Sequence, residues 1–377
     1  MRRLLAAAVA VAFLLPLCSA AGGDLETQAP ADAKSREASF AVAPGPFYNP
    51  NQGLGLQVMG IAMFHPQQND LVSPPSIAGL FGMYAVLPPL DEASTRYSFA
   101  LGGGSRLYLD EDRWRLAPVV AYFDLFRQFR GIGGDTTSTQ FDYRQYGVIA
   151  ILQAMREVLW KKFYAGLLVG YTAFKTWTAD PANQQILENL GTGAAWTGQP
   201  NFGVLAQYDT KDDQYYPGSG IDFNLRLNGS PKSGQEYAVL LPSVNQYFAL
   251  VGKDQVVLAY RVFSQFGFGE LPLASYAYYG SRGTALGYPS GDYVDKMMAG
   301  AEVEARWLFW WRLGLEGGVA EGKVFSSFGD FGPEPWLPSA WGSLTSQLME
   351  GKAIRARLTA AVSKSGGALY FAVGENF

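Results

Sequence analysis

The feature that most restricts the fold of this chain is a regular alternation of apolar and polar residues along strand-length segments. Successive side chains of a β-strand point to opposite faces, so each such segment has one apolar face and one polar face. Residues 221–228, 299–307 and 354–363 show the pattern most clearly. Their polar faces carry formal charges, on Arg226, Glu302, Glu304, Arg306, Arg355 and Arg357.

Two architectures produce this alternation, a soluble β-sandwich and a membrane-spanning β-barrel with a wet lumen. Sandwich strands average about 5–6 residues, whereas strands that cross a bilayer at a tilt need about 9–11. The alternating segments often run to about 10–14 residues, which suits the membrane. Aromatic residues also gather at segment ends, as in an interfacial girdle: Trp160 and Phe163, Trp307 to Trp311, and Tyr215 and Tyr216. We therefore predict an all-β fold, a transmembrane antiparallel β-barrel.

The composition agrees with a barrel and removes several classes of function. Charged residues are only 16% of the chain, aromatic residues are 14%, and there are 44 glycines, which suit tight turns and a lipid-facing surface. The net charge of −4 provides no basic field for a nucleic acid, so no such partner is expected. Cys18 is the only cysteine, which excludes thiolate zinc sites and cysteine nucleophiles in the mature chain.

The N-terminus is typical of a secretory signal peptide over residues 1–21. Arg2 and Arg3 precede an apolar stretch that ends at Leu17, and small residues follow at a cleavage position. Residues 22–50 are polar and aperiodic, and we interpret them as a flexible lead-in to a barrel over 51–377. No later window of about 20 apolar residues is present, so no transmembrane helix is expected.

Fifteen segments have the composition of strands. A single-chain bacterial barrel has an even number of strands, so we expect that one strand before residue 200 is missed or fused. Residues 148–162 also fit an amphipathic helix, but the neighbouring strands favour a strand and a turn. The predicted strands are 54–66, 75–88, 95–109, 112–129, 139–156, 158–176, 201–210, 219–229, 235–250, 254–268, 297–310, 312–324, 341–350, 352–364 and 367–377.

Four motifs make the chain resemble the bacterial surface antigen barrels, the superfamily of the BamA and TamA assembly factors. The first is the turn at 208–220, with Asp209, Lys211, Asp212, Asp213, Pro217 and Gly220. The second is a loop and the strand after it, with Leu286, Gly287, Tyr288, Pro289 and Gly291. The third is a glycine turn over 129–135, and the fourth is the closing strand over 370–377.

The resemblance implies a barrel of 16 strands in the bacterial outer membrane. The second motif would join strands eleven and twelve and fold back into the lumen, and the turn at 208–220 would be periplasmic. The closing strand would pair with the first strand near residues 53–55. Along that closing strand one parity would act as an assembly signal, read from Phe371, Val373 and Phe377, with Leu369 on the same face.

Two departures from the family pattern stand out. The arginine of the family loop falls on Leu286, and its aspartate partner falls on Ala320. Losing both members of an ion pair changes stability little, whereas losing one leaves a buried charge without a partner. We therefore expect packing of Leu286 and Tyr288 to hold the loop in the lumen. The family also carries periplasmic POTRA domains, and the short stretch before the first predicted strand leaves no room for one.

Other constellations point less clearly to chemistry. His65 is the only histidine, and we interpret it as a turn residue beside Pro66 rather than a member of a serine–histidine pair. Asp209, Asp212 and Asp213 could bind calcium, but a polar turn is the simpler interpretation. The charged side chains on the lumen faces either select ions or form ion pairs with side chains of neighbouring strands, and we favour the ion pairs. We expect no catalytic residues, no cofactor and no metal.

The resemblance implies assembly or translocation of polypeptides through a weak seam between the first and last strands. The expected partners are outer-membrane lipid, the assembly machinery during biogenesis, and unfolded polypeptide as a substrate. A passive pore or structural barrel without the docking domains is the alternative, and a lipid-active enzyme is a distant third.

Overall fold

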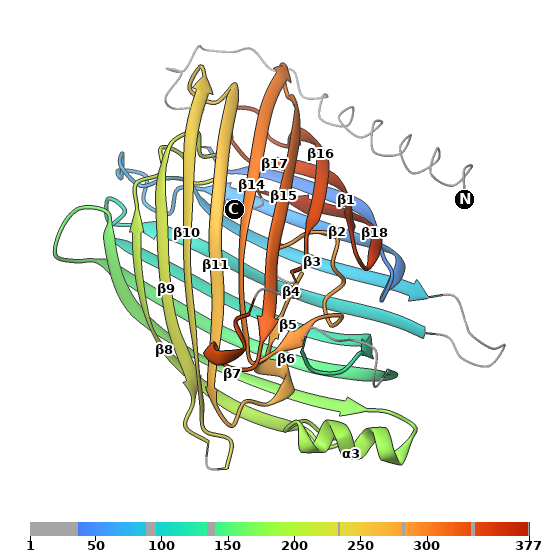
Figure 1. Cartoon of the computed structure of the whole chain (residues 1–377). Helices are drawn as coiled ribbons and strands as arrows, with labels where there is room; N and C mark the ends of the chain where they lie inside the picture. Colours follow the sequence, from blue (N-terminus) through green and yellow to red (C-terminus); the bar gives the residue numbers. More distant parts are fainter. Residues whose placement is uncertain are drawn as a thin grey trace.

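The computed structural model describes residues 37–87, 96–133, 140–232, 234–280, 283–332, 336–375 and 377. Sixteen antiparallel strands form a closed ring in which each strand pairs with its neighbour in the chain (Figure 1). The first and last strands close the ring at a single residue pair. This confirms the predicted fold class and the predicted strand number. The predicted signal peptide over residues 1–21 lies outside the described residues.

The strand bounds differ from the predicted ones mostly by a few residues. Residues 148–162 form the end of one strand and a turn, as expected. The barrel strands are β1 (Ser39–Asn49), β2 (Gly53–Phe64), β3 (Ser76–Leu87), β4 (Arg96–Leu109), β5 (Trp114–Phe129), β6 (Phe141–Glu157), β7 (Phe163–Trp177), β8 (Thr197–Asp209), β9 (Gly220–Ser230), β10 (Tyr237–Val251), β11 (Val256–Gly269), β14 (Met297–Trp310), β15 (Leu313–Phe325), β16 (Ser339–Gln347), β17 (Arg355–Ser363) and β18 (Gly366–Val373).

The missing strand is β1, which lies inside the stretch expected to be a flexible lead-in. The barrel therefore begins at Ser39 rather than at residue 51. Phe40 and Val42 are exposed on the outer face, whereas Ala43 and Phe47 are buried on the inner face. Outward and inward residues thus alternate along β1, but Pro44 and Pro46 interrupt the pattern, so the sequence did not indicate a strand there.

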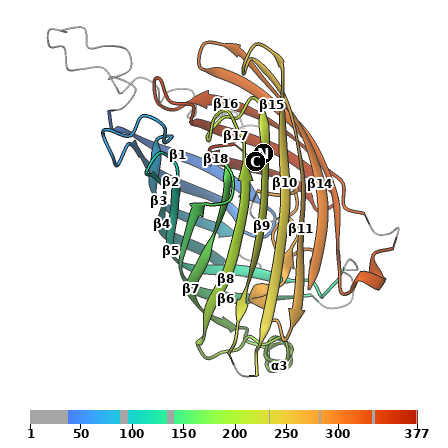
Figure 2. The ribbon, with the colours of Figure 1, turned by 90° about the vertical axis from the view of Figure 1, so that its left-hand side faces the viewer.

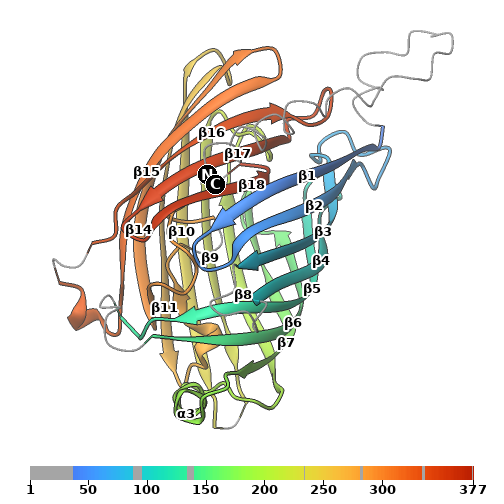
Figure 3. The same ribbon diagram turned by 90° about the vertical axis from the view of Figure 1, so that its right-hand side faces the viewer.

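Closure also differs from expectation. The last strand, β18, pairs with β1 and not with β2, which holds residues 53–55. Figure 3 shows β18 beside β1 at this seam. The count after the lumen loop is as predicted, because eleven barrel strands precede it and five follow it.

Large apolar side chains cover the outer face, and aromatic side chains gather near both ends of the barrel. At the end where β1 begins and β18 finishes, called here the terminus end, the exposed aromatic residues are Trp114, Trp160, Trp307, Trp310 and Trp311. The other end carries helix α3 (Pro181–Asn189), which lies beyond the strands (Figure 2), and has exposed Tyr84, Trp177 and Trp196. Two such belts are typical of the two membrane–water interfaces.

Among the described residues, no helix is both long and apolar enough to cross a membrane.

Residues 270–296, called here the lumen loop, connect β11 to β14. The loop contains a small antiparallel pair, β12 (Ala277–Tyr278) with β13 (Val294–Asp295).

Candidate functional site in the lumen and at the strand seam

The lumen loop folds into the barrel and packs on the inner wall. Leu286 is 8% exposed and Tyr288 is fully buried, and both belong to a buried apolar cluster. Ala320 of β15 and Trp341 of β16 lie in the same cluster. Both positions of the absent ion pair, Leu286 and Ala320, thus lie in one apolar contact region. Packing of the loop replaces the charge pair that the family pattern would place there.

Hydrogen bonds fix the tip of the lumen loop to the last two strands. The Gly287 carbonyl accepts from Ser363 Oγ at 2.8 Å, and the Gly287 N–H donates to Tyr370 Oη at 3.2 Å. A side chain at Gly287 would meet the Val362 carbonyl group at 3.0 Å, and its φ of +109° favours glycine. The Tyr288 hydroxyl donates to the Pro338 carbonyl at 2.8 Å. Pro289 and Gly291 lie in the same segment, with Gly291 at φ +115°.

A buried ion pair anchors the loop at a second point. Arg261 of β11 and Glu302 of β14 are directly paired in the ladder, and Arg261 Nη2 lies 3.0 Å from Glu302 Oε2. The other oxygen of Glu302 accepts a hydrogen bond from the backbone N–H of Ala285. The sequence singled out Glu302 as lumen-facing but missed Arg261. Its signal was available, since Arg261 follows Ala259 and precedes Phe263 on the inward parity of an alternating strand.

The glycine turn predicted at 129–135 meets the lumen loop. The Gly133 N–H donates to the Val294 carbonyl at 2.8 Å, and Arg130 Nε lies 3.4 Å from Asp292 Oδ1. Asn51, in the β1–β2 turn, donates to the same Asp292 oxygen at 2.7 Å. Motifs far apart in the sequence are thus joined by one loop. The last two residues of that turn motif lie outside the described residues.

The turn motif between β8 and β9 uses its carboxylates to shape its own backbone. Asp212 Oδ1 accepts from the N–H groups of Gly218 and Ser219 at 2.9 and 3.1 Å. Asp213 Oδ1 accepts from the N–H groups of Tyr215 and Tyr216 at 2.7 and 2.9 Å. Gly220 has φ +109°, and a side chain there would overlap the Thr210 carbonyl. These contacts support a structured turn rather than calcium ligation.

Asp209, the first acid of the motif, belongs to a buried network. Arg115 Nη1 donates to Asp209 Oδ2 at 2.7 Å, and the same guanidinium binds Asp112 at 2.8 Å. Lys211 Nζ lies 3.1 Å from Asp222 Oδ2. Burial would lower the pKa of Lys211, but the charges of Asp222 and Asp209 raise it above its usual value. The network holds the turn against the inner wall at the terminus end.

The same turn enters the lumen from the terminus end. Tyr216 is 5% exposed, and its ring lies 5.5 Å from the Arg306 guanidinium and 5.4 Å from that of Arg355. The Pro217 carbonyl accepts from Arg306 Nη1 at 3.4 Å. Two segments from opposite ends of the barrel, the turn and the lumen loop, therefore both enter its interior.

The seam between β1 and β18 has far less pairing than its neighbours. One residue pair is formed, Tyr48 with Leu369, near the α3 end, whereas β1 and β2 share eleven pairs. Successive N–H groups of a strand point alternately to its two neighbours. Because the ladder with β2 is unbroken, Pro44 and Pro46 have their nitrogens on the β18 side. Both lack an N–H, so neither can donate across the seam.

Beyond Tyr48 the last strand turns inward instead of following β1. The Phe371 carbonyl accepts a hydrogen bond from the side-chain amide of Gln57, on the inner face of β2. The Phe371 ring fills the space in front of Gly45, on the inner face of β1. The later part of β18 therefore lies on the lumen side of the first two strands.

The closing residues then enter the lumen. Phe371 and Val373 pair with β17 as strand residues, but Gly374 has φ +91° and redirects the chain. The Arg261 guanidinium lies 4.6 Å from the Phe377 ring centroid, and Arg306 Nη2 donates to the main-chain terminal oxygen of Phe377 at 2.9 Å. The sequence put Phe377 on the same strand parity as Phe371 and Val373, but its ring lies in the lumen, because β18 ends at Val373 and Gly374 redirects the chain.

Comparisons with solved structures identify the fold. BamA from Haemophilus ducreyi lacking POTRA domains 1–3 matches with a TM-score of 0.53 and 15% identity, over 89% of this chain and 70% of that chain. CdiB from Acinetobacter baumannii matches with a TM-score of 0.55 and 10% identity, over 89% of this chain and 59% of that chain. CdiB from Escherichia coli matches with a TM-score of 0.57 and 10% identity, over 89% of this chain and 62% of that chain. The chain thus spans about six tenths of each CdiB chain. No family model and no curated protein matches the sequence.

Proposed function

We propose that this chain is an outer-membrane barrel that passes or inserts polypeptide segments through an opening between β1 and β18. The observation that carries the proposal is the seam, which has one residue pair and two prolines that cannot donate to the last strand. The shared fold with BamA and CdiB supports the same class of activity. Unfolded polypeptide is the proposed substrate.

The seam is the place where the ring opens at least cost. A backbone hydrogen bond contributes about 0.5–1.5 kcal/mol net, so the cost of separating two strands rises with the number of paired residues. β17 and β18 share eight pairs, and β14 and β15 share thirteen, against one across the seam. Parting β1 from β18 would expose two strand edges, which are templates for pairing with an incoming strand.

The proposed location is the bacterial outer membrane, with the terminus end toward the periplasm. The barrel has an apolar outer face with aromatic belts near both ends, which suits contact with lipid. Its own insertion would need the assembly machinery of that membrane. A nucleic acid partner is not proposed, because the net charge is −4.

A disulfide across the seam tests the proposal. Tyr48→Cys with Leu369→Cys joins the one paired position, where antiparallel neighbours have Cα atoms about 4.5–5.5 Å apart, within disulfide range. Val58→Cys with Gly82→Cys is the matched control, because this pair joins β2 to β3. In a gene-deletion strain, outer-membrane protein levels should fall with the oxidised seam pair, recover on reduction and remain normal with the control pair. Normal levels with a fully oxidised seam would refute the proposal.

A passive pore is the weaker alternative. The lumen loop, the turn between β8 and β9, and the residues after β18 all enter the interior. Such filling opposes steady ion flow. Conductance in planar bilayers distinguishes the two functions, since large, stable open currents from the unmodified protein would favour the pore.

A further inference from the structure

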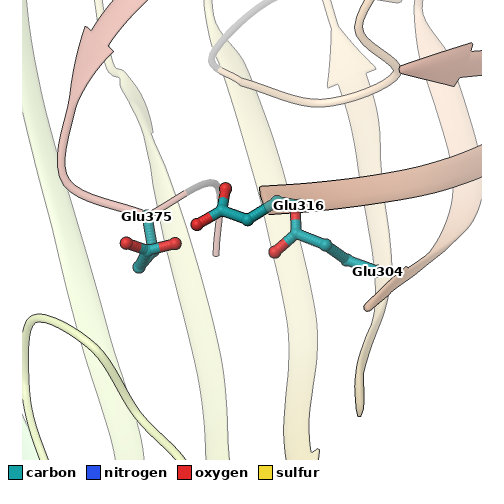
Figure 4. Close-up of side chains that lie close together, drawn as sticks. All are labelled: Glu304, Glu316 and Glu375. Carbon is teal, nitrogen blue, oxygen red and sulfur yellow. The ribbon is translucent and has the colours of Figure 1, made fainter. Parts of the chain in front are cut away.

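Three carboxylates from three separate segments converge inside the barrel. Glu304 belongs to β14, Glu316 to β15, and Glu375 lies just after β18 (Figure 4). One carboxylate oxygen from each lies within 4.8 Å of the others. The side chains of Glu304, Glu316 and Glu375 are 0%, 1% and 4% exposed. These three acids are not the acids of the turn motif, Asp209, Asp212 and Asp213, although Pro217 of that turn contacts Arg306 beside the cluster.

Two of the three carboxylates have no hydrogen-bond donor among the described residues. Glu304 is satisfied, because it accepts from Arg306 Nε at 2.8 Å and from Trp341 Nε1 at 3.3 Å. Neither oxygen of Glu316 and neither oxygen of Glu375 accepts a hydrogen bond. Buried carboxylate oxygens without a donor are costly, so a further positive partner is needed at this point.

The neighbouring arginines do not supply that partner. Arg357 Nη1 lies 3.7 Å from Glu316, and Arg306 Nε lies 3.7 Å from Glu375, both longer than a hydrogen bond. These are the only cationic side chains of the described residues within 4.0 Å of the three acids. Three carboxylates therefore face two guanidinium groups. With all three acids ionised, these two guanidinium groups leave one buried negative charge uncompensated.

We propose that Glu304, Glu316 and Glu375 bind a calcium ion. A site built from carboxylate oxygens alone selects a hard cation. Calcium accepts oxygen ligands at about 2.3–2.6 Å in flexible geometry, so two ligands on opposite sides of the ion are about 4.6–5.2 Å apart. The observed spread of up to 4.8 Å suits this size. Magnesium needs ligands at about 2.0–2.1 Å in a strict octahedron, which the cluster fits less well.

The site would link the end of the seam strand to the barrel wall. Glu304 and Glu316 lie on two strands with a long shared ladder, whereas Glu375 lies on the segment that leaves the seam. Bound calcium would hold the residues after β18 inside the lumen, and removal of the ion would release them. This effect on the seam rests on the proposed function, whereas binding of the ion does not.

Terbium, a luminescent substitute for calcium, provides a direct test. The Trp341 indole lies 3.3 Å from Glu304, close enough to sensitise terbium emission. Chelator-treated protein in detergent should show terbium luminescence that calcium displaces and magnesium displaces poorly. Glu316→Gln and Glu375→Gln should each weaken calcium binding about tenfold or more, because each removes a charged ligand. Glu270→Gln, at an exposed position, should leave binding unchanged.

A second readout separates folding defects from loss of the site. Trp341→Phe should remove the luminescence while calcium still raises the thermal unfolding temperature. The proposal is overturned if the unmodified protein binds neither terbium nor millimolar calcium, because a shared proton or a shift of Arg357 then neutralises the cluster. It is also overturned if both glutamine variants bind as tightly as the unmodified protein. Calcium binding without any effect on seam-dependent activity would refute the link between the ion and the seam, whereas failure of the seam disulfide test would refute the proposed function and leave the calcium site intact.

Discussion

The aromatic ring of Phe371 occupies the space that a side chain on Gly45 would need. The two residues lie on opposite sides of the seam, and a Cβ atom on Gly45 would overlap the ring. Together with the hydrogen bond from Gln57 to the Phe371 carbonyl, this contact holds the inward-turned end of β18 on the lumen side of β1. The contact is therefore a means of altering the seam without touching its paired residues.

Gly45→Leu should push Phe371 away and loosen the seam. We expect a loss of about 1–3 kcal/mol in the free energy of unfolding, because overpacking forces both strands to move. Urea unfolding in lipid vesicles, followed by tryptophan fluorescence, measures it. Gly60→Leu is the control, since an outer-face Cβ there meets no atom within 4 Å. Equal stability of the two variants would contradict the packing argument.

Pro46→Val should strengthen the seam by restoring a donor toward β18. The expected gain is one backbone hydrogen bond, about 1 kcal/mol. Hydrogen–deuterium exchange should slow for residues 44–48 and 369–373, and the seam-dependent activity should fall. Unchanged exchange in these segments would show that the missing N–H is not what keeps the strands apart.

Arg261→Ala should release the lumen loop. The substitution leaves Glu302 buried without its charge partner, which costs about 3–5 kcal/mol. Proteolysis of residues 270–296 in the folded barrel should accelerate. The double variant Arg261→Met with Glu302→Gln removes both charges and should be less damaged. If the double variant is cut as quickly as the single one, the unpaired charge is not the cause.

Leu286→Arg should also disturb the loop, because it brings a cation into an apolar cluster. Adding Ala320→Asp should recover much of the loss, since the two positions lie in the same cluster and the resemblance pairs them. A double-mutant cycle on unfolding free energies measures the coupling. Additive effects would show that the two positions do not interact.

Asp70 should make the free energy of unfolding depend on pH in the acidic range. Burial tends to raise its pKa, but hydrogen bonds from Ser73, Glu111 and Val72 lower it to about 2. The unfolded value is about 3.9, so Asp70 stabilises the fold fully above that pH and loses this contribution as the pH falls toward 2. Asp70→Asn should cost about 1 kcal/mol at pH 7 and little near pH 2. Urea unfolding across this range measures the difference, and a constant difference would contradict it.

Strand alternation allowed much of the architecture to be predicted from local sequence. The inward positions of Glu302, Glu304, Arg306, Arg355 and Arg357 follow from parity alone, and all five are buried in the structure. The strand number followed from the even-number rule and from the resemblance. Parity is a local property, because each side chain of a strand points opposite to its neighbours whatever the rest of the chain does.

The tertiary structure decided how the ring closes and what fills it. Pro44 and Pro46 concealed β1 from the pattern, so the partner of the last strand was predicted wrongly. Past Gly374 no strand parity applies, and only the folded chain shows that Glu375 reaches Glu304 and Glu316. Local sequence determines which face of a strand a residue occupies. The meeting of distant segments inside the lumen depends on closure of the whole ring and on packing within it.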